Sequence, residues 1–254
     1  GMPVAAGGSQ VIVDALASIA TANGAEIDCD HPVRTVRDLP SARAVLMDLT
    51  PTGAAALLGV PGPRWRYGVA AWKLDLVLSG PMPWTAEACR RAGTVHLGGP
   101  AAEVAVAERA TSRGGLPHRP FVLVTQPSVA DPSRAVRGQS VVHAYRHVPN
   151  GSSDGAATAG IGAQFDRFAP GWRDLVIERL VTAPGDFAAA NANFVGGDIA
   201  GGAMTARQTL ARPRLARDPY RLDDRVWLCS QSTPPGPGVH GMCGWHAAGS
   251  VLRA

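Results

Sequence analysis

The strongest constraint on the fold is a glycine-rich turn placed close to the end of the chain. Residues Gly236 to Gly241 match the pattern G-x-G-x-x-G of dinucleotide-binding turns. Such a turn normally opens a βαβ unit, with a second strand and an acidic residue about 20 positions further on. Only residues 242–254 follow it here, which leaves no room for that second strand. We therefore expect the match to be accidental and the complete βαβ unit to be absent.

The chemistry of this turn is still informative. Gly236, Gly238, Gly241 and Gly244 have no Cβ atoms, so a flat ligand could approach the backbone closely. A strand before the turn and a helix after it would leave free backbone N–H groups at the positive end of the helix dipole. This arrangement favours an anion or a polar ring. A helix cap in a tight turn is the alternative, but it needs only one glycine.

Composition indicates a globular protein. The 254 residues are 46% apolar and 17% charged, which allows a sizeable core. The net charge of +4 comes almost entirely from arginines spread along the chain, so nucleic acid is not an expected partner. No apolar run approaches the ~20 residues of a transmembrane helix. The N-terminus lacks the features of a signal peptide, and we expect a cytoplasmic protein.

The four cysteines, Cys29, Cys89, Cys229 and Cys243, are widely scattered and form no C-x-x-C pair. This spacing favours reduced, buried thiols over disulfides or a zinc site, and no metal is expected. The histidine pair His143 and His147 falls in a strand pattern, where a spacing of four places the two side chains about 13 Å apart. Each is better interpreted as a surface or hydrogen-bonded histidine than as a metal ligand.

The first 60 residues predict part of an α/β layer. A helix over 10–21 with Ser9 as its N-cap would bury Val11, Val13, Leu16 and Ile19. Short strands are expected at 26–29 and 33–36, a buried strand at 42–49 and a helix from Thr50 to Leu58. The first strand of such a layer is missing from this pattern.

The middle of the chain predicts an α+β unit with an antiparallel or mixed sheet. Trp72, Leu74, Leu76 and Leu78 alternate with more polar residues, the period of a strand covered on one face. Further strands are expected at 94–97, 121–126 and 140–148, and helices at 101–111, 161–168 and 172–181.

The last third is expected to be rich in loops. A loop over 184–219 contains the stretch Asn193-Phe194-Val195-Gly196-Gly197-Asp198, and a loop of this length is usually functional or disordered. A short buried strand at 225–229 and a final helix at about 241–253 enclose the glycine-rich turn.

Residues 228–244 resemble the C-terminal flavin motif of the phytoene desaturase-like FAD-dependent oxidoreductases, within the amine-oxidase-like flavoproteins. Gly7-Gly8-Ser9-Gln10 resembles the family's G-G-(S/T/M) segment, and residues 193–198 resemble its N-x-x-G-G-D loop. The resemblance implies a partial FAD-binding segment at 1–60, a substrate-binding domain at 61–222 and a C-terminal FAD segment at 223–254. The implied fold class is α+β with an α/β remnant, lacking the N-terminal Rossmann unit.

The resemblance also implies roles for particular residues. Cofactor contacts fall on Ser230, Ser232, Thr233, Pro235, Gly236, Gly238, Val239, His240, Gly241 and Met242. A loop facing the substrate or flavin falls on Asn193, Gly196, Gly197 and Asp198. His240 would lie beside the flavin and could tune its electronics. No particular catalytic acid or base is implied.

The family's N-terminal FAD fingerprint is absent from this chain. We therefore expect the C-terminal part of an FAD-dependent dehydrogenase or desaturase acting on an apolar substrate, with weak or absent FAD binding and little activity alone. Two alternatives stay open: a non-catalytic binding or interaction module, and one subunit of a split flavoenzyme. Apolar surface left exposed by the missing half would favour an N-terminal partner or self-association.

Overall fold

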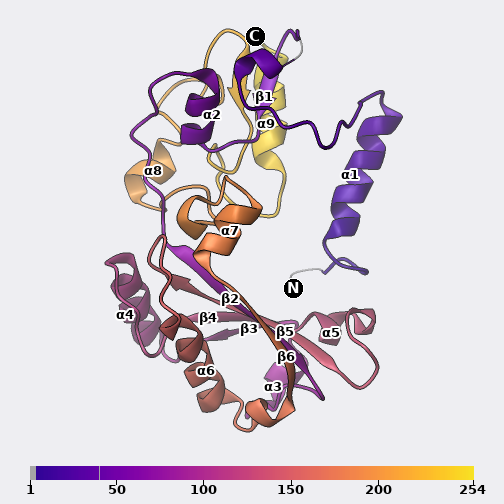
Figure 1. Cartoon of the computed structure of the whole chain (residues 1–254), viewed down its shortest axis with the longest axis vertical. Coiled ribbons are helices and arrows are strands. Elements are labelled where there is room, and N and C mark those ends of the chain that lie inside the picture. Colours follow the sequence, from indigo (N-terminus) through magenta and orange to yellow (C-terminus); the bar gives the residue numbers. More distant parts are fainter. Residues whose placement is uncertain (1–3, 40) are drawn as a thin grey trace. The chain divides into compact units, whose positions relative to one another are not determined.

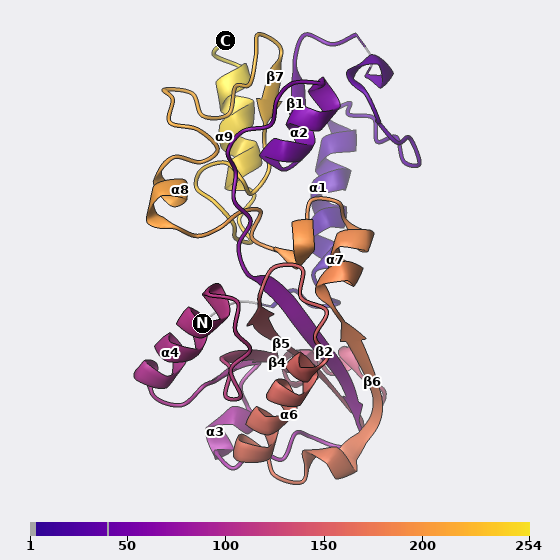
Figure 2. The ribbon, with the colours of Figure 1, turned by 60° about the vertical axis from the view of Figure 1, so that its left-hand side comes forward.

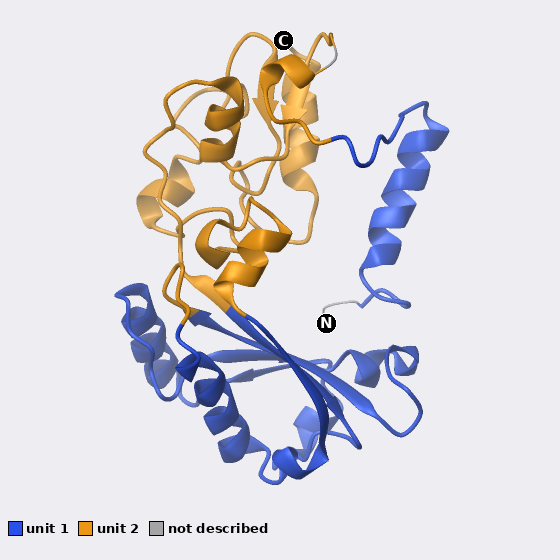
Figure 3. Cartoon of the chain, in the orientation of Figure 1, with its two compact units in different colours: residues 1–31, 72–147, 154–182 blue, residues 32–71, 148–153, 183–254 orange. Residues whose placement is uncertain are grey.

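The computed structural model describes residues 4–39 and 41–254, which form two compact units (Figure 3). Unit 1 holds residues 1–31, 72–147 and 154–182, and unit 2 holds residues 32–71, 148–153 and 183–254. The chain passes between the units several times, and each unit is described separately below.

Unit 1 is built on a five-stranded sheet (Figure 1). The strand order is β3-β4-β5-β2-β6, and the pairs β3/β4, β4/β5 and β2/β6 are antiparallel. The strands are β2 (Ala70–Leu78), β3 (Thr94–Leu97), β4 (Val122–Thr125), β5 (Ser140–Val148) and β6 (Val176–Thr182). The helices are α1 (Gln10–Ala22), α3 (Glu87–Arg90), α4 (Ala101–Ser112), α5 (Pro127–Ala130), η2 (Pro132–Arg134), α6 (Ala156–Phe168) and η3 (Trp172–Leu175).

The core of unit 1 lies between this sheet and α6, which crosses one of its faces (Figure 2). Trp72, Leu74, Leu76 and Leu78 of β2 are all buried, as their alternation predicts. Trp72 donates its indole N–H to the Thr158 hydroxyl of α6 at 2.8 Å. Phe165, fully buried, makes edge-to-face contacts with Trp84 and Trp172. Aromatic packing therefore fixes α6 on the sheet.

The other face of the sheet carries half-buried polar residues. The Asp75 carboxylate contacts the Lys73 ammonium at 2.8 Å and the His143 Nδ1 atom at 2.5 Å. His147 Nδ1 lies 2.6 Å from a carboxylate oxygen of Glu108 on α4. Each histidine has its own carboxylate partner, as expected for hydrogen-bonded histidines.

The helix predicted over 172–181 is wrong. Residues 172–175 form the single turn η3, and residues 176–182 form the edge strand β6. Val176, Ile177, Val181 and Thr182 are β-branched, and a neighbouring β2 offers the chain a ladder of hydrogen bonds. Tertiary pairing thus overrides the helical spacing seen in the sequence.

Three expectations for the N-terminal segment are also wrong. The helix α1 forms, but it has no buried residues, and Val11, Val13, Leu16 and Ile19 are 41–62% exposed. Ser9 makes no side-chain capping hydrogen bond. No strand forms at 26–29 or 33–36, where the described backbone holds only the turn η1 (Val36–Asp38). Without a neighbouring strand, these short segments cannot pair.

Unit 2 contains a parallel pair of short strands, β1 (Val45–Met47) and β7 (Val226–Leu228). The helix α2 (Pro51–Leu58) packs on one face, where Met47, Ala54, Val226 and Leu228 form a buried cluster. Trp227 points to the opposite face and donates its indole N–H to Ser250 of α9 (Met242–Val251) at 3.0 Å. This sandwich of helix, parallel strands and helix is an α/β layer of minimal width.

The long segment predicted as loop contains short helices: α7 (Pro184–Ala190), η4 (Val195–Gly197) and α8 (Ala206–Leu210). Helices together with parallel and antiparallel sheets confirm the predicted α+β class with an α/β remnant. The domain boundaries at 60 and 222 stay predictions. Among the described residues, no helix has the length and apolar character needed to cross a bilayer.

Phe165→Ala should test how far the aromatic cluster stabilises unit 1. Removing this buried ring should lower the free energy of unfolding by about 3–5 kcal/mol, because the cavity between Trp84 and Trp172 cannot fully collapse. Urea denaturation followed by tryptophan fluorescence measures the loss. Val106→Ala, at a side chain 70% exposed on α4, is the control and should change stability little. Equal effects of the two substitutions would contradict this account of the core.

Candidate functional site

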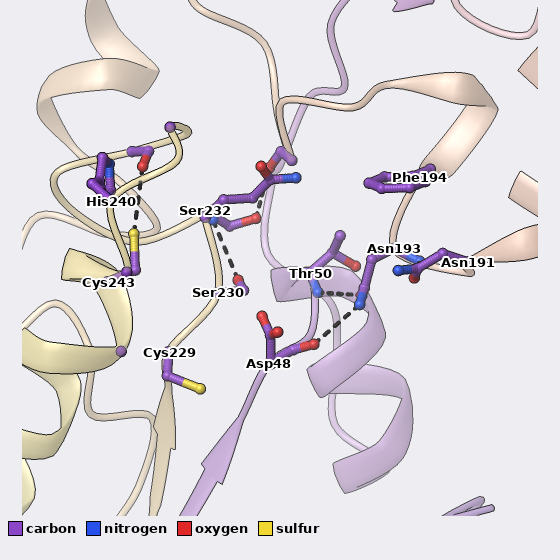
Figure 4. Close-up of a pocket in the computed structure, with 16 residues that line it drawn as sticks. Asp48, Thr50, Asn191, Asn193, Phe194, Cys229, Ser230, Ser232, His240 and Cys243 are labelled. Carbon is purple, nitrogen blue, oxygen red and sulfur yellow. Dashed lines mark hydrogen bonds between the residues drawn. The ribbon is translucent and has the colours of Figure 1, made fainter. Parts of the chain in front are cut away.

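A pocket of about 490 Å³ opens in unit 2 where β1 and β7 both end (Figure 4). Asp48 and Thr50 follow β1, and Cys229, Ser230 and Ser232 follow β7. Because the strands are parallel, their carboxyl ends lie at the same edge, the usual ligand site of an open α/β sheet. We call this cavity the strand-end pocket.

Asn193 forms one wall of the strand-end pocket. Its side-chain oxygen accepts a hydrogen bond from the Thr50 backbone N–H at 2.9 Å, and its side-chain nitrogen donates to the Asp48 carbonyl at 3.0 Å. The Asn191 side chain holds the Asn193 backbone N–H in turn. Segments about 145 residues apart in the sequence are thus joined by one amide side chain.

The opposite wall is the loop after β7, which is held by its own hydroxyl groups. Ser232 donates to the Gly201 carbonyl at 2.6 Å, and Thr233 donates to the Ser230 carbonyl at 2.7 Å. Both side chains are fully buried. Their hydrogen bonds to backbone carbonyls shape the loop, so these hydroxyl groups stabilise a turn and do not act as nucleophiles.

The N-terminus of α9 closes the pocket. Gly241 is its N-cap with φ of 62°, and Cys243 and Gly244 of the first turn line the cavity. The backbone N–H groups of a first helical turn have no partner within the helix, and the helix dipole makes this end positive. The His240 Nδ1 atom accepts a hydrogen bond from one of these N–H groups, that of Met242, at 3.0 Å. This end of the pocket therefore suits a negative or electron-rich group.

Arg212 lies behind the loop and supports it. Its side chain is 2% exposed and donates to the carbonyls of Gln231 at 3.0 Å and Gly202 at 3.3 Å. Gly236, with φ of +107°, approaches so closely that an added Cβ would lie 3.2 Å from the guanidinium. Burial lowers the pKa of Arg212, and the charge of Asp198 acts against that shift.

Seven of the residues predicted to contact cofactor or substrate line the strand-end pocket: Asn193, Ser230, Ser232, Gly236, Gly238, His240 and Gly241. Seven others lie outside its lining: Thr233, Pro235, Val239, Met242, Gly196, Gly197 and Asp198. The glycine-rich turn and the asparagine loop therefore meet at one cavity. Their role in binding a cofactor stays a prediction.

The G-G-D part of the asparagine loop serves packing in this structure. Gly197 has φ of +83°, and an added Cβ would lie 2.6 Å from both the Cα and the Cβ atom of Pro184. The fully buried Asp198 carboxylate accepts hydrogen bonds from the backbone N–H groups of Gly68 and Ala200, both at 2.7 Å. These contacts fix the loop that presents Asn193.

Sequence reasoning missed several residues of the site. From the sequence, Asp48 lies at the end of a predicted strand and Thr50 at the start of a predicted helix, and neither is assigned a functional role. Knowing that a parallel strand pairs with β1 would have identified them, because ligands bind at the carboxyl ends of parallel strands. Cys229, Gly244 and Cys243 lie inside the recognised motif. Arg212 and Gly201 gave no signal, because their importance depends on long-range contacts.

Contrary to the expectation from the sequence, the four cysteines are not all buried. All four cysteines are free, but Cys29 is exposed, Cys89 and Cys229 are half-buried, and Cys243 is buried. Burial, with help from Asp48 and Cys243, raises the pKa of the Cys229 thiol to about 11. Cys229 is thus protonated and unreactive at neutral pH. Among the described residues, no group of three or more His, Cys, Asp or Glu side chains could hold a metal ion.

Comparisons with known proteins point to oxidoreductases. A search against protein-family models found no match. The chain is 27% identical over 97% of its length to the rat protein "Pyridine nucleotide-disulfide oxidoreductase domain-containing protein 2". It is 30% identical over 56% of its length to the mouse protein of the same name. The chain spans about half the length of the rat relative, and the mouse alignment covers 26% of that protein.

The fold is similar to that of a solved oxidoreductase from Methanosarcina mazei. The TM-score is 0.55 with 13% sequence identity, and the match covers 98% of this chain and 55% of the other. This likeness shows a shared fold. Together, the sequence relatives and the fold support a relationship to oxidoreductases.

The raised pKa of Cys229 predicts slow alkylation that accelerates with pH. At pH 8 its thiolate fraction should be roughly 200-fold below that of a thiol with the ordinary pKa near 8.5, and it should rise about tenfold per pH unit up to about 11. Iodoacetamide labelling of the native protein followed by peptide mass spectrometry measures both rates. The exposed Cys29 is the internal control. Equal labelling of the two thiols at pH 8 would contradict the raised pKa of Cys229.

Proposed function

We propose that this chain is the C-terminal part of an FAD-dependent oxidoreductase, a dehydrogenase or desaturase acting on an apolar substrate. The observation that carries the proposal is the strand-end pocket. A glycine-rich loop, a helix N-terminus and the carboxyl ends of two parallel strands meet there. The relationship to oxidoreductases supports the reaction class, and the resemblance to phytoene desaturase-like enzymes supports the flavin.

The residues of the pocket fit the ring of a flavin. The volume of the strand-end pocket, about 490 Å³, lies within the range of about 300–1,000 Å³ usual for small-molecule sites. Gly241 and Gly244 leave open space at the α9 end, because an added Cβ would meet no atom within 4 Å at either position. A flat ring with carbonyl and imide groups can accept and donate hydrogen bonds along such a backbone surface.

The roles of the chain's own residues follow from this fit. A bound flavin would take up a hydride equivalent from a C–H or C–N bond of the substrate. The first turn of α9 would stabilise negative charge that develops on the ring. The buried cation of Arg212 would add to that field through the loop that it supports. Asn193 would hold the β1 side of the pocket in place and would take no part in proton transfer.

The rest of the FAD site would come from an N-terminal part. The strand β1 has β7 on one side, and no described strand pairs with its other edge. Leu46 on β1 is 41% exposed, and α1 exposes an apolar surface along its whole length. The rat relative is about twice as long as the region that aligns with this chain. We propose that a segment with a parallel β-strand, on the same or another polypeptide, pairs with β1 and supplies the pyrophosphate site.

Two alternatives give different outcomes in solution. A homo-oligomer would cover the same apolar surfaces with a second copy of the chain. A non-catalytic interaction module would keep the fold and bind no flavin. Titration with FAD separates the flavoprotein from the module, and the mass measured by light scattering detects the oligomer.

Titration of the chain with FAD should give weak binding, with a dissociation constant between about 1 μM and 1 mM. Gly244→Leu should abolish this binding, because an added Cβ meets no atom within 4 Å there and the rest of the side chain would occupy the α9 end of the pocket. Flavin fluorescence measures the affinity. Thermal denaturation should show the Gly244→Leu fold intact, since replacing a helical glycine stabilises a helix by about 0.5–1 kcal/mol.

Gly185→Leu is the matched control. Gly185 also lies in the first turn of a helix, α7, in open space, but it does not line the pocket. This variant should bind FAD like the wild type. Nanomolar binding by the wild type would overturn the requirement for an N-terminal part, and no binding at millimolar FAD would favour the interaction module.

A further inference from the structure

A second concave surface of unit 2, of about 1,050 Å³, is lined by four arginines and no acidic residue. We call it the arginine pocket. Arg64 and Arg66 come from the segment before β2, Arg207 comes from α8, and Arg214 follows α8. None of these residues lines the strand-end pocket. A cleft with charges of one sign concentrates the electric field and attracts counter-ions.

The guanidinium groups have little to neutralise them. Within residues 4–39 and 41–254, no carboxylate lies within 4 Å of the side chain of Arg64, Arg66, Arg207 or Arg214. The Arg214 side chain donates to a backbone carbonyl, that of Arg221. By contrast, Arg167 and Arg173 of unit 1 each pair with a carboxylate. The arginine pocket thus gathers like charges that have no carboxylate partner among the described residues.

The backbone beneath these arginines is held firmly. The Gln208 side chain of α8 accepts a hydrogen bond from the Arg66 N–H at 3.1 Å and donates to the Arg66 carbonyl at 2.8 Å. Trp65 donates its indole N–H to the Gly201 carbonyl at 3.2 Å, and its ring lies 5.7 Å from the buried Arg212 guanidinium. Two segments about 140 residues apart therefore present their arginines from a fixed frame.

Apolar side chains border the same cleft. Leu210 is 83% exposed and Leu215 is 88% exposed, and both line it beside Trp65. Exposed leucine side chains beside arginines that have no carboxylate partner are suited to a ligand with a negatively charged part and an apolar part. Arginine matches phosphate well, because its planar fork forms two parallel hydrogen bonds and stays charged at all physiological pH values.

We propose that the arginine pocket binds a phosphate ester, with the phosphate on the arginines and an apolar substituent against Leu210 and Leu215. The same chemistry is found in a soluble phosphorylated molecule and in the headgroup region of an anionic lipid. The site is independent of the flavin proposal, since it shares no lining residue with the strand-end pocket.

Calorimetric titration of the whole chain with octyl phosphate tests the proposal. The double variant Arg64→Gln/Arg207→Gln should weaken binding by at least about tenfold, through loss of charge-assisted hydrogen bonds. The control Arg113→Gln/Arg137→Gln removes the same charge from exposed positions of unit 1 and should leave the affinity unchanged. Leu210→Ser/Leu215→Ser should keep inorganic phosphate binding and lose the preference for the octyl ester.

Cosedimentation separates the two sources of phosphate. Binding to phosphatidylglycerol vesicles, but not to phosphatidylcholine vesicles or octyl phosphate, would assign the site to lipid headgroups. Binding to octyl phosphate without vesicle binding would assign it to a soluble ester. The proposal is overturned if the wild type binds none of these probes, if succinate binds as well as phosphate, or if both arginine variants lose equal affinity.

Discussion

The parallel pairing of β1 with β7 is the contact on which unit 2 depends. It places Val45 beside Val226 and Met47 beside Leu228, and so brings together segments about 180 residues apart. Because parallel strands end at the same edge, the turns after Met47 and Leu228 are forced to be neighbours. The strand-end pocket is the direct result. The Asn193 side chain then binds the segment that follows β1, which the strand pairing has already positioned.

Arg212 has a similar role on the far side of the loop. Two of its hydrogen bonds connect the carbonyls of Gln231 and Gly202, and the Gly201 carbonyl accepts from both Ser232 and Trp65. Gly201 lines the strand-end pocket and Trp65 lines the arginine pocket, so the hydrogen bond between them connects the linings of the two cavities. A buried arginine without a carboxylate in contact is costly unless its donors are used. Here one donor, Nε, finds no acceptor among the described residues, so the guanidinium is not fully hydrogen-bonded.

Local patterns in the sequence were enough to predict much of the fold. The period-two alternation of residues 72–78 predicted the strand β2, and the helix predicted between Thr50 and Leu58 is α2. The pattern failed where partners decide the outcome. β6 became a strand because β2 was available to pair with it, and α1 stayed exposed because nothing in the described chain covers it. Partnership between distant segments leaves no local signature.

The same distinction applies to the candidate site. A glycine-rich turn followed by a helix can be recognised from a few neighbouring residues, and the structure places that turn at a pocket. Asp48, Gly201 and Arg212 could not be found in this way, since each contributes through contacts that span the chain. The buried cluster of Met47, Ala54, Val226 and Leu228 joins β1, α2 and β7, and its apolar burial helps to hold these long-range contacts. Any molecule that binds the native arrangement stabilises it by mass action. Pairing of a further strand with β1 and ligand binding at the strand ends would therefore reinforce one another, because both favour the same placement of β1 beside β7.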